Sequence, residues 1–242
     1  MILSRREMLF GGAAWGGGKA LETLLGPELP RAWPIIRVKT DEPYVCIGLD
    51  DGWNPKAVEQ FLVIAEKYKT NFTVFPVGRV MTKDPTLWQE VKAAGHEIGN
   101  HSHDHVYIRN LSKARIKWSF RVFEDYDYPE VFGEAFAEPG LARVPFAEGP
   151  INRLVQEALY ELGDKQVHWL RDSYSWARDG FDSPKNRKYA LEKIGGLAQG
   201  EIGVMHFTAL DLAILPILLE SLAEKGLTNV PFSVLWEARK NK

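Results

Sequence analysis

Two short motifs carry residue types that could bind a metal ion and perform acid–base chemistry. Asp50 and Asp51 stand side by side after an apolar run, and His101 and His105 follow about fifty residues later. Imidazole nitrogen and carboxylate oxygen are ligands that zinc prefers. A second carboxylate beside such a site can act as a general base toward water. The sequence therefore predicts metal-assisted hydrolysis, with Gly52 permitting the tight turn that lets the two carboxylates point in different directions.

The histidine cluster has two interpretations, because His103 lies between His101 and His105. On a helical turn, residues four apart share a face and the ring between them turns away. On a strand, all three rings would share a face. We favour the helical turn, which leaves His103 out of the ligand set.

The elements that must position these residues alternate between strand-like and helix-like patterns. Apolar and β-branched runs predict strands over 44–49, 72–77, 97–100, 141–144, 167–170, 202–207 and 230–232. Amphipathic spacing and capping residues predict helices over 55–68, 85–94, 112–123, 151–162, 185–194, 210–225 and 234–239. Repeated strand–helix units indicate an α/β protein with a parallel sheet, either open or closed into a barrel.

Several polar residues fall at or near the carboxyl ends of the expected strands. In both kinds of parallel sheet, this edge carries the active site. The residues are Asp50, His101, Arg143, Asp172 and His206. Their placement predicts one shared chemical face, but it does not choose between an open sheet and a barrel.

Composition narrows the function classes. The net charge is −2 over 242 residues, so no broad basic surface indicates nucleic-acid binding. Cys46 is the only cysteine, which excludes an internal disulfide and a cysteine-based zinc site. Any metal must therefore use His, Asp or Glu. No segment supplies the roughly 20 apolar residues that cross a bilayer, so we expect no transmembrane segment.

We interpret residues 1–33 as a leader and linker, and residues 34–242 as one folded domain. The stretch that begins Ser4-Arg5-Arg6 resembles a twin-arginine export signal and continues with small and apolar residues. Lys19 interrupts this stretch and no clear A-x-A cleavage site follows, so a tail without signal function stays open. An export signal would place the protein outside the cytoplasm, in the periplasm, the cell wall or the medium.

Five short motifs occur in order between Tyr44 and His206. Together they resemble those of polysaccharide deacetylases of the NodB-homology type, carbohydrate esterase family four. The family motifs T-F-D-D-G, H-[ST]-x-x-H, R-x-P-Y, D-x-x-x-W and L-x-H are matched by segments that begin at Gly48, His101, Arg143, Asp172 and Val204. The resemblance implies a single domain folded as a distorted (β/α)7-type barrel, similar to a TIM barrel.

The resemblance also implies a metal centre and the groups around it. The implied ligands of a divalent metal, usually zinc in this family, are Asp51, His101 and His105. The backbone N–H of Phe146 would help the metal to stabilise the oxyanion, and Pro145 and Trp176 would shape the pocket wall.

Two proton carriers follow from the same resemblance. Asp50 would be the general base, paired with Arg143, and His206 would be the general acid, held by Asp172. An arginine favours the ionised form of a neighbouring carboxylate, and a carboxylate favours the protonated form of a neighbouring imidazole. Both pairings therefore suit the implied roles.

The implied activity is removal of acetyl groups from N-acetylglucosamine units of a polysaccharide such as peptidoglycan or a chitin-like polymer. Such an enzyme is a hydrolase that acts on carbon–nitrogen bonds other than peptide bonds, and its partner is a carbohydrate polymer or oligomer. Two alternatives stay open. One is an O-acetyl esterase that acts on an acetylated polysaccharide such as xylan. The other is an inactive carbohydrate-binding protein on the same scaffold.

The sequence departs from the family pattern at several positions. Gly48 stands in place of Thr and Leu49 in place of Phe, and we expect both to change local packing only. Phe146 replaces Tyr, Ser175 replaces a frequent acidic residue, and Val204 replaces Leu. None of these changes removes a proposed ligand or catalytic group, so they bear on substrate choice more than on activity.

Two aromatic features could contact a sugar. Residues 124–136 are acidic and aromatic, and form either a lip over the site or a variable surface loop. Trp53 directly follows the Asp50-Asp51-Gly52 turn and is either a sugar contact or a core residue.

Overall fold

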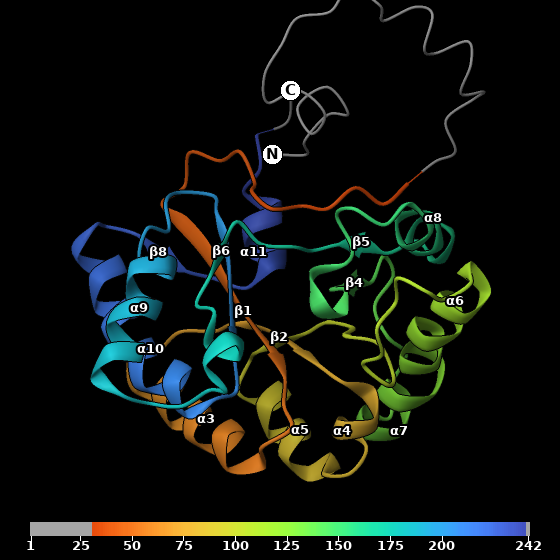
Figure 1. Ribbon diagram of the computed structural model, residues 1–242, viewed down its shortest axis with the longest axis horizontal. Coiled ribbons are helices and arrows are strands. Elements are labelled where there is room, and N and C mark those ends of the chain that lie inside the picture. Colours follow the sequence, from red (N-terminus) through yellow and green to blue (C-terminus); the bar gives the residue numbers. More distant parts are fainter. Residues whose placement is uncertain (1–30, 241–242) are drawn as a thin grey trace, which may run out of the picture.

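The computed structural model describes residues 31–240, so most of the expected leader lies outside the described residues. Figure 1 shows helices arranged around a central group of strands. The strands are β1 Tyr44–Asp51, β2 Thr73–Pro76, β3 Glu97–Ile98, β4 Leu141–Ala142, β5 Lys165–Gln166, β6 Arg171–Asp172, β7 Ile202–His206 and β8 Thr228–Asn229. The α-helices are α3 Pro55–Tyr68, α4 Gly78–Met81, α5 Pro85–Ala93, α6 Lys113–Val122, α7 Tyr128–Phe132, α8 Arg153–Leu162, α9 Pro184–Ile194, α10 Ala209–Glu224 and α11 Phe232–Glu237. Three further helical segments are the π-helix η1 Phe123–Asp127 and the 3-10 helices η2 Pro145–Ala147 and η3 Ser175–Arg178.

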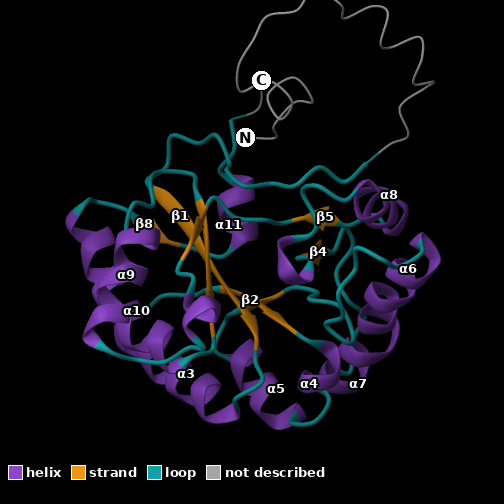
Figure 2. Cartoon of the chain, viewed as in Figure 1, coloured by secondary structure: helices purple, strands orange, loops and turns teal. Residues whose placement is uncertain are grey.

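The strands form a parallel arrangement that curves into a distorted barrel (Figure 2). Its main sheet has the order β3-β2-β1-β7-β6, and β8 pairs with the start of β1. An isolated bridge from Asn100 to Ala142 joins the end of β3 to the β4-β5 pair, and a bridge from Val167 to Ile35 continues from β5. The predicted α/β barrel is confirmed, and the barrel rather than the open sheet is the observed form.

Strand β1 lies between β2 and β7 in the main sheet, and both of its faces are covered by apolar side chains. Its residues Val45, Ile47 and Leu49 are buried in the main core, together with side chains of α3 and α10. A strand that is buried on both faces is a continuous apolar run rather than an alternating one. Helix α3 begins at Pro55 and buries Val58 and Phe61 on one face. The apolar contacts of β1 thus hold the Asp50–Asp51 end of the strand in place.

Two of the expected strands are wrong. Residues 167–170 connect β5 to β6, and of this segment only Val167 makes a ladder contact, with Ile35. Its apolar residues include buried and half-buried ones, which the sequence pattern cannot distinguish from a strand. The expected strand over 230–232 is also absent, because β8 ends at Asn229 and Pro231 is the N-cap of α11.

The acidic, aromatic segment 124–136 packs part of its apolar side chains on the core and forms no lip over the cavity. It forms most of η1 and all of α7, where Tyr128 and Val131 are buried, and Phe136 packs against the main core. None of its residues lines the cavity described below. Among the described helices, none combines the length and the apolar character needed to cross a membrane.

Candidate active site

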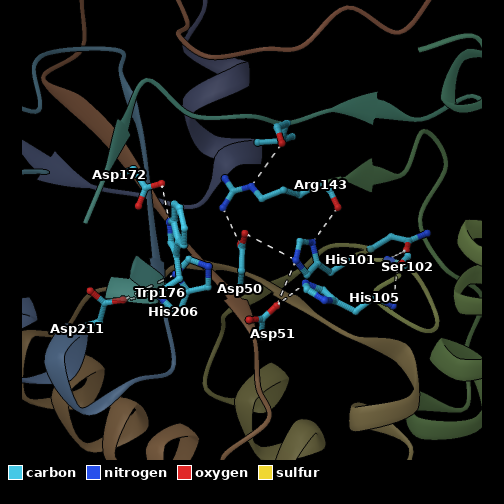
Figure 3. A network of polar contacts seen from close by, with 12 residues as sticks. Asp50, Asp51, His101, Ser102, His105, Arg143, Asp172, Trp176, His206 and Asp211 are labelled. Atoms are coloured by element: carbon cyan, nitrogen blue, oxygen red, sulfur yellow. Dashed lines mark hydrogen bonds and ion pairs between the residues drawn. The ribbon is translucent and has the colours of Figure 1, made fainter. Parts of the chain in front are cut away.

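A cavity of about 440 Å³ opens at the carboxyl ends of the strands. Its wall is formed by side chains from β1, β6 and β7 and from the loops that follow β3, β4, β5 and β6. The lining residues are Asp50, Asp51, His101, His105, Tyr107, Arg109, Val144, Phe146, Ala147, Trp169, Asp172, Trp176 and His206. Every predicted site residue except Arg143 and Pro145 therefore faces this cavity, and Arg143 reaches it through Asp50 (Figure 3).

Asp50 and Asp51 point to different partners although they are adjacent. Asp50 Oδ1 accepts a hydrogen bond from Arg143 Nη1 at 2.8 Å. Asp51 Oδ1 lies 3.3 Å from His101 Nε2 and 3.0 Å from His105 Nε2. The chain turns sharply here, with φ values of 79° at Asp51 and 91° at Gly52, and a Cβ on Gly52 would lie only 2.4 Å from the Trp88 ring. Glycine is therefore required both for the conformation and for the space.

The histidine motif is a bent loop, so the expected helical turn is wrong. Ser102 and His105 have positive φ values of 66° and 51°. Ser102 Oγ accepts the His105 backbone N–H at 3.1 Å, and the buried Asn100 side chain accepts the Ser102 N–H at 2.8 Å. These bonds bring His101 and His105 together without a helix. The His103 ring lies elsewhere, with Nδ1 at 2.7 Å from Asp127 Oδ2.

Asp51, His101 and His105 could hold a metal ion, because one ligand atom of each lies within 4.8 Å of the others. The Arg143 carbonyl can only accept a hydrogen bond, so His101 Nδ1–H donates to it at 2.8 Å and leaves Nε2 with a free lone pair. Asp51 Oδ1 is buried without a hydrogen bond in the described structure. Burial alone would raise the pKa of Asp51, but contacts with both rings hold it well below its usual range. An ionised oxygen and two ring nitrogens that face one another fit a zinc-like ion.

Arg143 is fully buried and fixes Asp50 from behind the cavity. Its guanidinium carbon lies 4.2 Å from the centre of the Phe75 ring. A Cβ at position 48 would lie 2.3 Å from Arg143 Nη1. Gly48 therefore does more than change local packing, contrary to our expectation, since it provides the space that the guanidinium occupies beside Asp50.

Asp172 does not hold His206 as the resemblance implied. Asp172 Oδ1 accepts the Tyr174 backbone N–H at 2.6 Å, and Oδ2 accepts Trp176 Nε1–H at 3.3 Å. Across the described residues, no hydrogen bond or ion pair links Asp172 to His206. Asp211, a residue that sequence reasoning missed, instead accepts the His206 backbone N–H at 2.6 Å. Asp172 thus anchors the loop that carries Trp176, and a different carboxylate lies beside the His206 ring.

Of the remaining predicted residues, Phe146 and Trp176 line the cavity and Pro145 does not. Phe146 has a positive φ of 57°, and its ring stacks on Tyr107 with centroids 3.8 Å apart. Pro145 is buried beneath this turn, and Trp176 is exposed at the opposite side of the site. Tyr107 was missed, although an aromatic residue two positions after His105 is the signal that could have found it.

Trp53 is 47% exposed, so the alternative that it is a core residue is wrong. Its ring meets the His105 ring edge-on at 6.1 Å, and the Arg79 guanidinium lies 5.2 Å from its centre. Trp53 therefore stands next to the proposed metal ligands at the surface.

Comparison with known proteins was made by sequence and by structure. A family profile described as polysaccharide deacetylase matches residues 37–163. A peptidoglycan-N-acetylglucosamine deacetylase of Bacillus cereus is 31% identical over 219 residues, which cover 88% of this chain and 97% of that protein.

Two solved structures share the fold. A peptidoglycan N-acetylglucosamine deacetylase bound to a hydroxamate-type benzamide superposes with a TM-score of 0.75 at 19% identity, covering 88% of this chain and 96% of the other. A wild-type CE4 family pseudoenzyme from Bacillus anthracis superposes with a TM-score of 0.74 at 19% identity, covering 87% of this chain and 71% of the other. The fold is thus compatible with both active and inactive proteins, and the side chains must decide between them.

Proposed function

Because this chain belongs to the polysaccharide deacetylase family, we propose that it hydrolyses the N-acetyl groups of N-acetylglucosamine units in a polysaccharide, with peptidoglycan as the first candidate and chitin-like polymers as the second. The observation that carries this proposal is the convergence of Asp51, His101 and His105 beside the buried Asp50–Arg143 pair in one cavity. Peptidoglycan comes first because the relative that matches over 97% of its own length carries that substrate in its name.

The proposed ligands of a divalent metal, with zinc as the preferred ion, are Asp51, His101 and His105. When bound, such an ion would polarise the acetyl carbonyl and make a coordinated water more acidic. The chain's own contribution is the orientation of the ligands. The His101 ring is fixed by its hydrogen bond to the Arg143 carbonyl, which also selects the tautomer that can coordinate.

Asp50 is the proposed general base. Its Oδ1 is engaged by Arg143, and its Oδ2 lies 3.9 Å from His101 Nε2, on the side of the proposed metal ligands. The carboxylate is therefore held with one oxygen free to take a proton from the attacking water. The buried guanidinium compensates the carboxylate charge in a site from which water is largely excluded.

Proton donation and charge stabilisation complete the proposed reaction. His206 donates a proton to the leaving nitrogen as the carbon–nitrogen bond breaks. The backbone N–H of Phe146 is the proposed donor to the oxyanion, Trp176 is the proposed wall of the acetyl pocket, and the buried Pro145 is proposed to support that wall.

The test is acetate release from N-acetylglucosamine oligomers and from peptidoglycan. Protein stripped with EDTA should be inactive, and zinc should restore the activity. Asp50→Ala should abolish release while zinc still binds, because the base is lost and the three ligands stay. Asp182→Ala is the matched control, since Asp182 pairs with Arg187 outside the cavity and its loss should leave the rate unchanged.

Zinc binding without acetate release from either glycan would contradict the proposal. Release from acetylated xylan instead would favour the O-acetyl esterase, which needs less help from His206 because an alkoxide leaves more readily than an unprotonated nitrogen. Glycan binding without release from any substrate would favour an inactive scaffold.

We also propose that residues 1–33 direct export and that residues 34–242 are the deacetylase domain. A reporter fused to residues 1–33 should be exported, and Arg5→Lys combined with Arg6→Lys should stop that export. A reporter that stays in the cytoplasm in both forms would contradict the leader assignment.

A further inference from the structure

Asp211 lies in the first turn of α10, directly behind His206. The residue is fully buried. Its Oδ2 accepts the His206 backbone N–H at 2.6 Å and the Ser175 hydroxyl at 2.5 Å, and it lies 3.9 Å from His206 Nδ1 (Figure 3). Its own N–H donates to Thr208 Oγ1 at 3.1 Å, which caps the helix. The carboxylate is therefore fixed from three elements: β7, η3 and α10.

Two buried polar atoms at this point have no hydrogen-bond partner in the described structure. They are His206 Nδ1 and Asp211 Oδ1. One can carry a proton and the other can accept it, and unpaired buried groups of this kind are costly. The ring and the carboxylate are neighbours, with His206 Nδ1 3.9 Å from Asp211 Oδ2. Asp172 instead makes its hydrogen bonds to Tyr174 and Trp176, and no hydrogen bond or ion pair joins it to the His206 ring in the described structure.

We propose that Asp211 is the positioning residue that orients the His206 imidazole, a role that rests on the deacetylase function proposed above. Asp211 holds the proton on Nδ1, so the proton on Nε2 is the one that passes to the leaving nitrogen. When the carbon–nitrogen bond breaks, that nitrogen gains the proton and the ring is left neutral, with its remaining proton on Nδ1. A carboxylate behind a catalytic imidazole fixes the tautomer and stabilises the imidazolium in this way.

Ser175 belongs to the same arrangement. It stands at the position where the family pattern often has an acidic residue, and its hydroxyl donates to Asp211 Oδ2. An acidic side chain at this buried position would place a second negative charge next to Asp211. Ser175, which is neutral and donates a hydrogen bond, therefore suits a position next to the Asp211 carboxylate.

The test compares two substrates that differ in their need for an acid. In an N-acetylglucosamine oligomer the leaving group is the sugar nitrogen, which must gain a proton as the carbon–nitrogen bond breaks. In 4-nitrophenyl acetate the leaving group is 4-nitrophenolate, a stable anion that needs no proton. In zinc-loaded full-length protein, Asp211→Asn should lower kcat on the oligomer about 10- to 100-fold with little change in KM, because loss of the positioning group removes only part of the roughly 10²- to 10⁴-fold that general acid–base catalysis supplies. Hydrolysis of 4-nitrophenyl acetate should stay within about twofold of the wild type. Ser175→Ala should show a smaller loss of the same kind, which keeps the test decisive if Asp211→Asn fails to fold.

Two other variants separate this role from its alternatives. Asp172→Asn should raise KM through the Trp176 loop and keep the ratio of the two activities. Glu201→Gln removes another buried carboxylate, which pairs with Arg171 away from the cavity, and should leave both activities unchanged. Equal losses on both substrates in Asp211→Asn, or a loss confined to the oligomer in Asp172→Asn alone, would overturn the proposal.

A second readout does not need glycan turnover. Nitrogen-15 NMR of the histidine rings should find the neutral His206 ring protonated on Nδ1 in the wild type and in Asp172→Asn, and on Nε2 to a large extent in Asp211→Asn. The same tautomer in all three proteins would overturn the positioning role. If the wild type releases no acetate from either glycan, the proposed function fails, and the NMR comparison still decides whether Asp211 orients the ring.

Discussion

At Gly48, a Cβ atom would lie 2.3 Å from Arg143 Nη1 and 2.7 Å from Nη2. The absent side chain is what allows a fully buried guanidinium to reach Asp50. Burying the Asp50–Arg143 ion pair costs desolvation energy, which offsets much of the Coulomb attraction between the two charges. The surrounding packing must therefore keep the two side chains in place. Small steric changes behind the pair are therefore expected to affect catalysis as much as direct changes to the two charges.

Gly48→Ala should displace Arg143 from Asp50 and lower kcat on an N-acetylglucosamine oligomer by about 100-fold, the size of loss that a misplacement of about 1 Å produces. Overpacking of a rigid core should also lower the free energy of unfolding by about 1–3 kcal/mol. Acetate release and urea unfolding measure the two effects. Gly203→Ala on neighbouring β7 is the matched control, because its Cβ would meet only flexible side chains, the nearest being Leu197 at 3.2 Å. Full activity of Gly48→Ala would show that the pair tolerates displacement.

At the scale of an element, the loop after β3 brings His101 and His105 together, which a helical turn was expected to do. Asn100 is buried at its start, where its oxygen accepts the Ser102 N–H and its amide donates to the Phe120 carbonyl and to Glu124 Oε1. The side chain therefore ties the loop to α6 and η1. These contacts compensate for the positive φ values within the loop, as expected where strained backbone persists at a functional site.

Asn100→Ala should weaken zinc binding by about 10- to 100-fold, because groups that orient metal ligands have effects of this size. Competition with a chromophoric chelator measures the affinity directly. Asn71→Ala removes a comparable amide that donates to the Ala94 carbonyl far from the cavity, and should bind zinc as the wild type does. If a folded Asn100→Ala protein keeps full affinity, the loop geometry does not depend on this side chain.

At the scale of the whole molecule, the half-buried Glu124 of η1 and the buried Asp164, directly before β5, form a pair of neighbouring carboxyl groups. Burial and the neighbouring Asp164 raise the pKa of Glu124, and burial raises the pKa of Asp164. A group whose pKa is raised in the folded state adds stability below its unfolded pKa, and this stability is lost as pH rises through the folded pKa. The pair should therefore make the fold less stable toward alkaline pH.

Glu124→Gln should reduce this loss, since an amide keeps the hydrogen bond from Asn100 without gaining a charge. Urea unfolding near neutral pH and at alkaline pH should give a smaller difference in unfolding free energy for the variant than for the wild type. Glu134→Gln is the control, because Glu134 is exposed and its pKa is lowered by Lys92 instead. An identical pH dependence in wild type and Glu124→Gln would contradict the raised pKa of Glu124.

The alternating elements, the family and most of the residues around the cavity follow from the order of amino acids alone. Helix α3 has the predicted bounds, because a proline at its start and apolar residues three and four apart are local signals. The carboxyl ends of parallel strands meet at one edge whatever the register, so the order of elements was enough to place Asp50, Arg143 and His206 together. Such features depend on short-range periodicity and on strand direction, which the chain encodes locally.

The partner of each side chain, by contrast, depends on how distant segments pack. The space at Gly48 for Arg143, the bond from Asn100 to Phe120 and the bond from Ser175 to Asp211 all join residues far apart in the chain. The segment 124–136 likewise had the composition of a surface feature, yet its Tyr128 and Val131 are buried in the core while Tyr126 is exposed. The sequence determines which chemical groups are available. Only the packing of the elements sets the distances between these groups and leaves some buried atoms unpaired, and these features indicate which carboxylate lies beside which histidine.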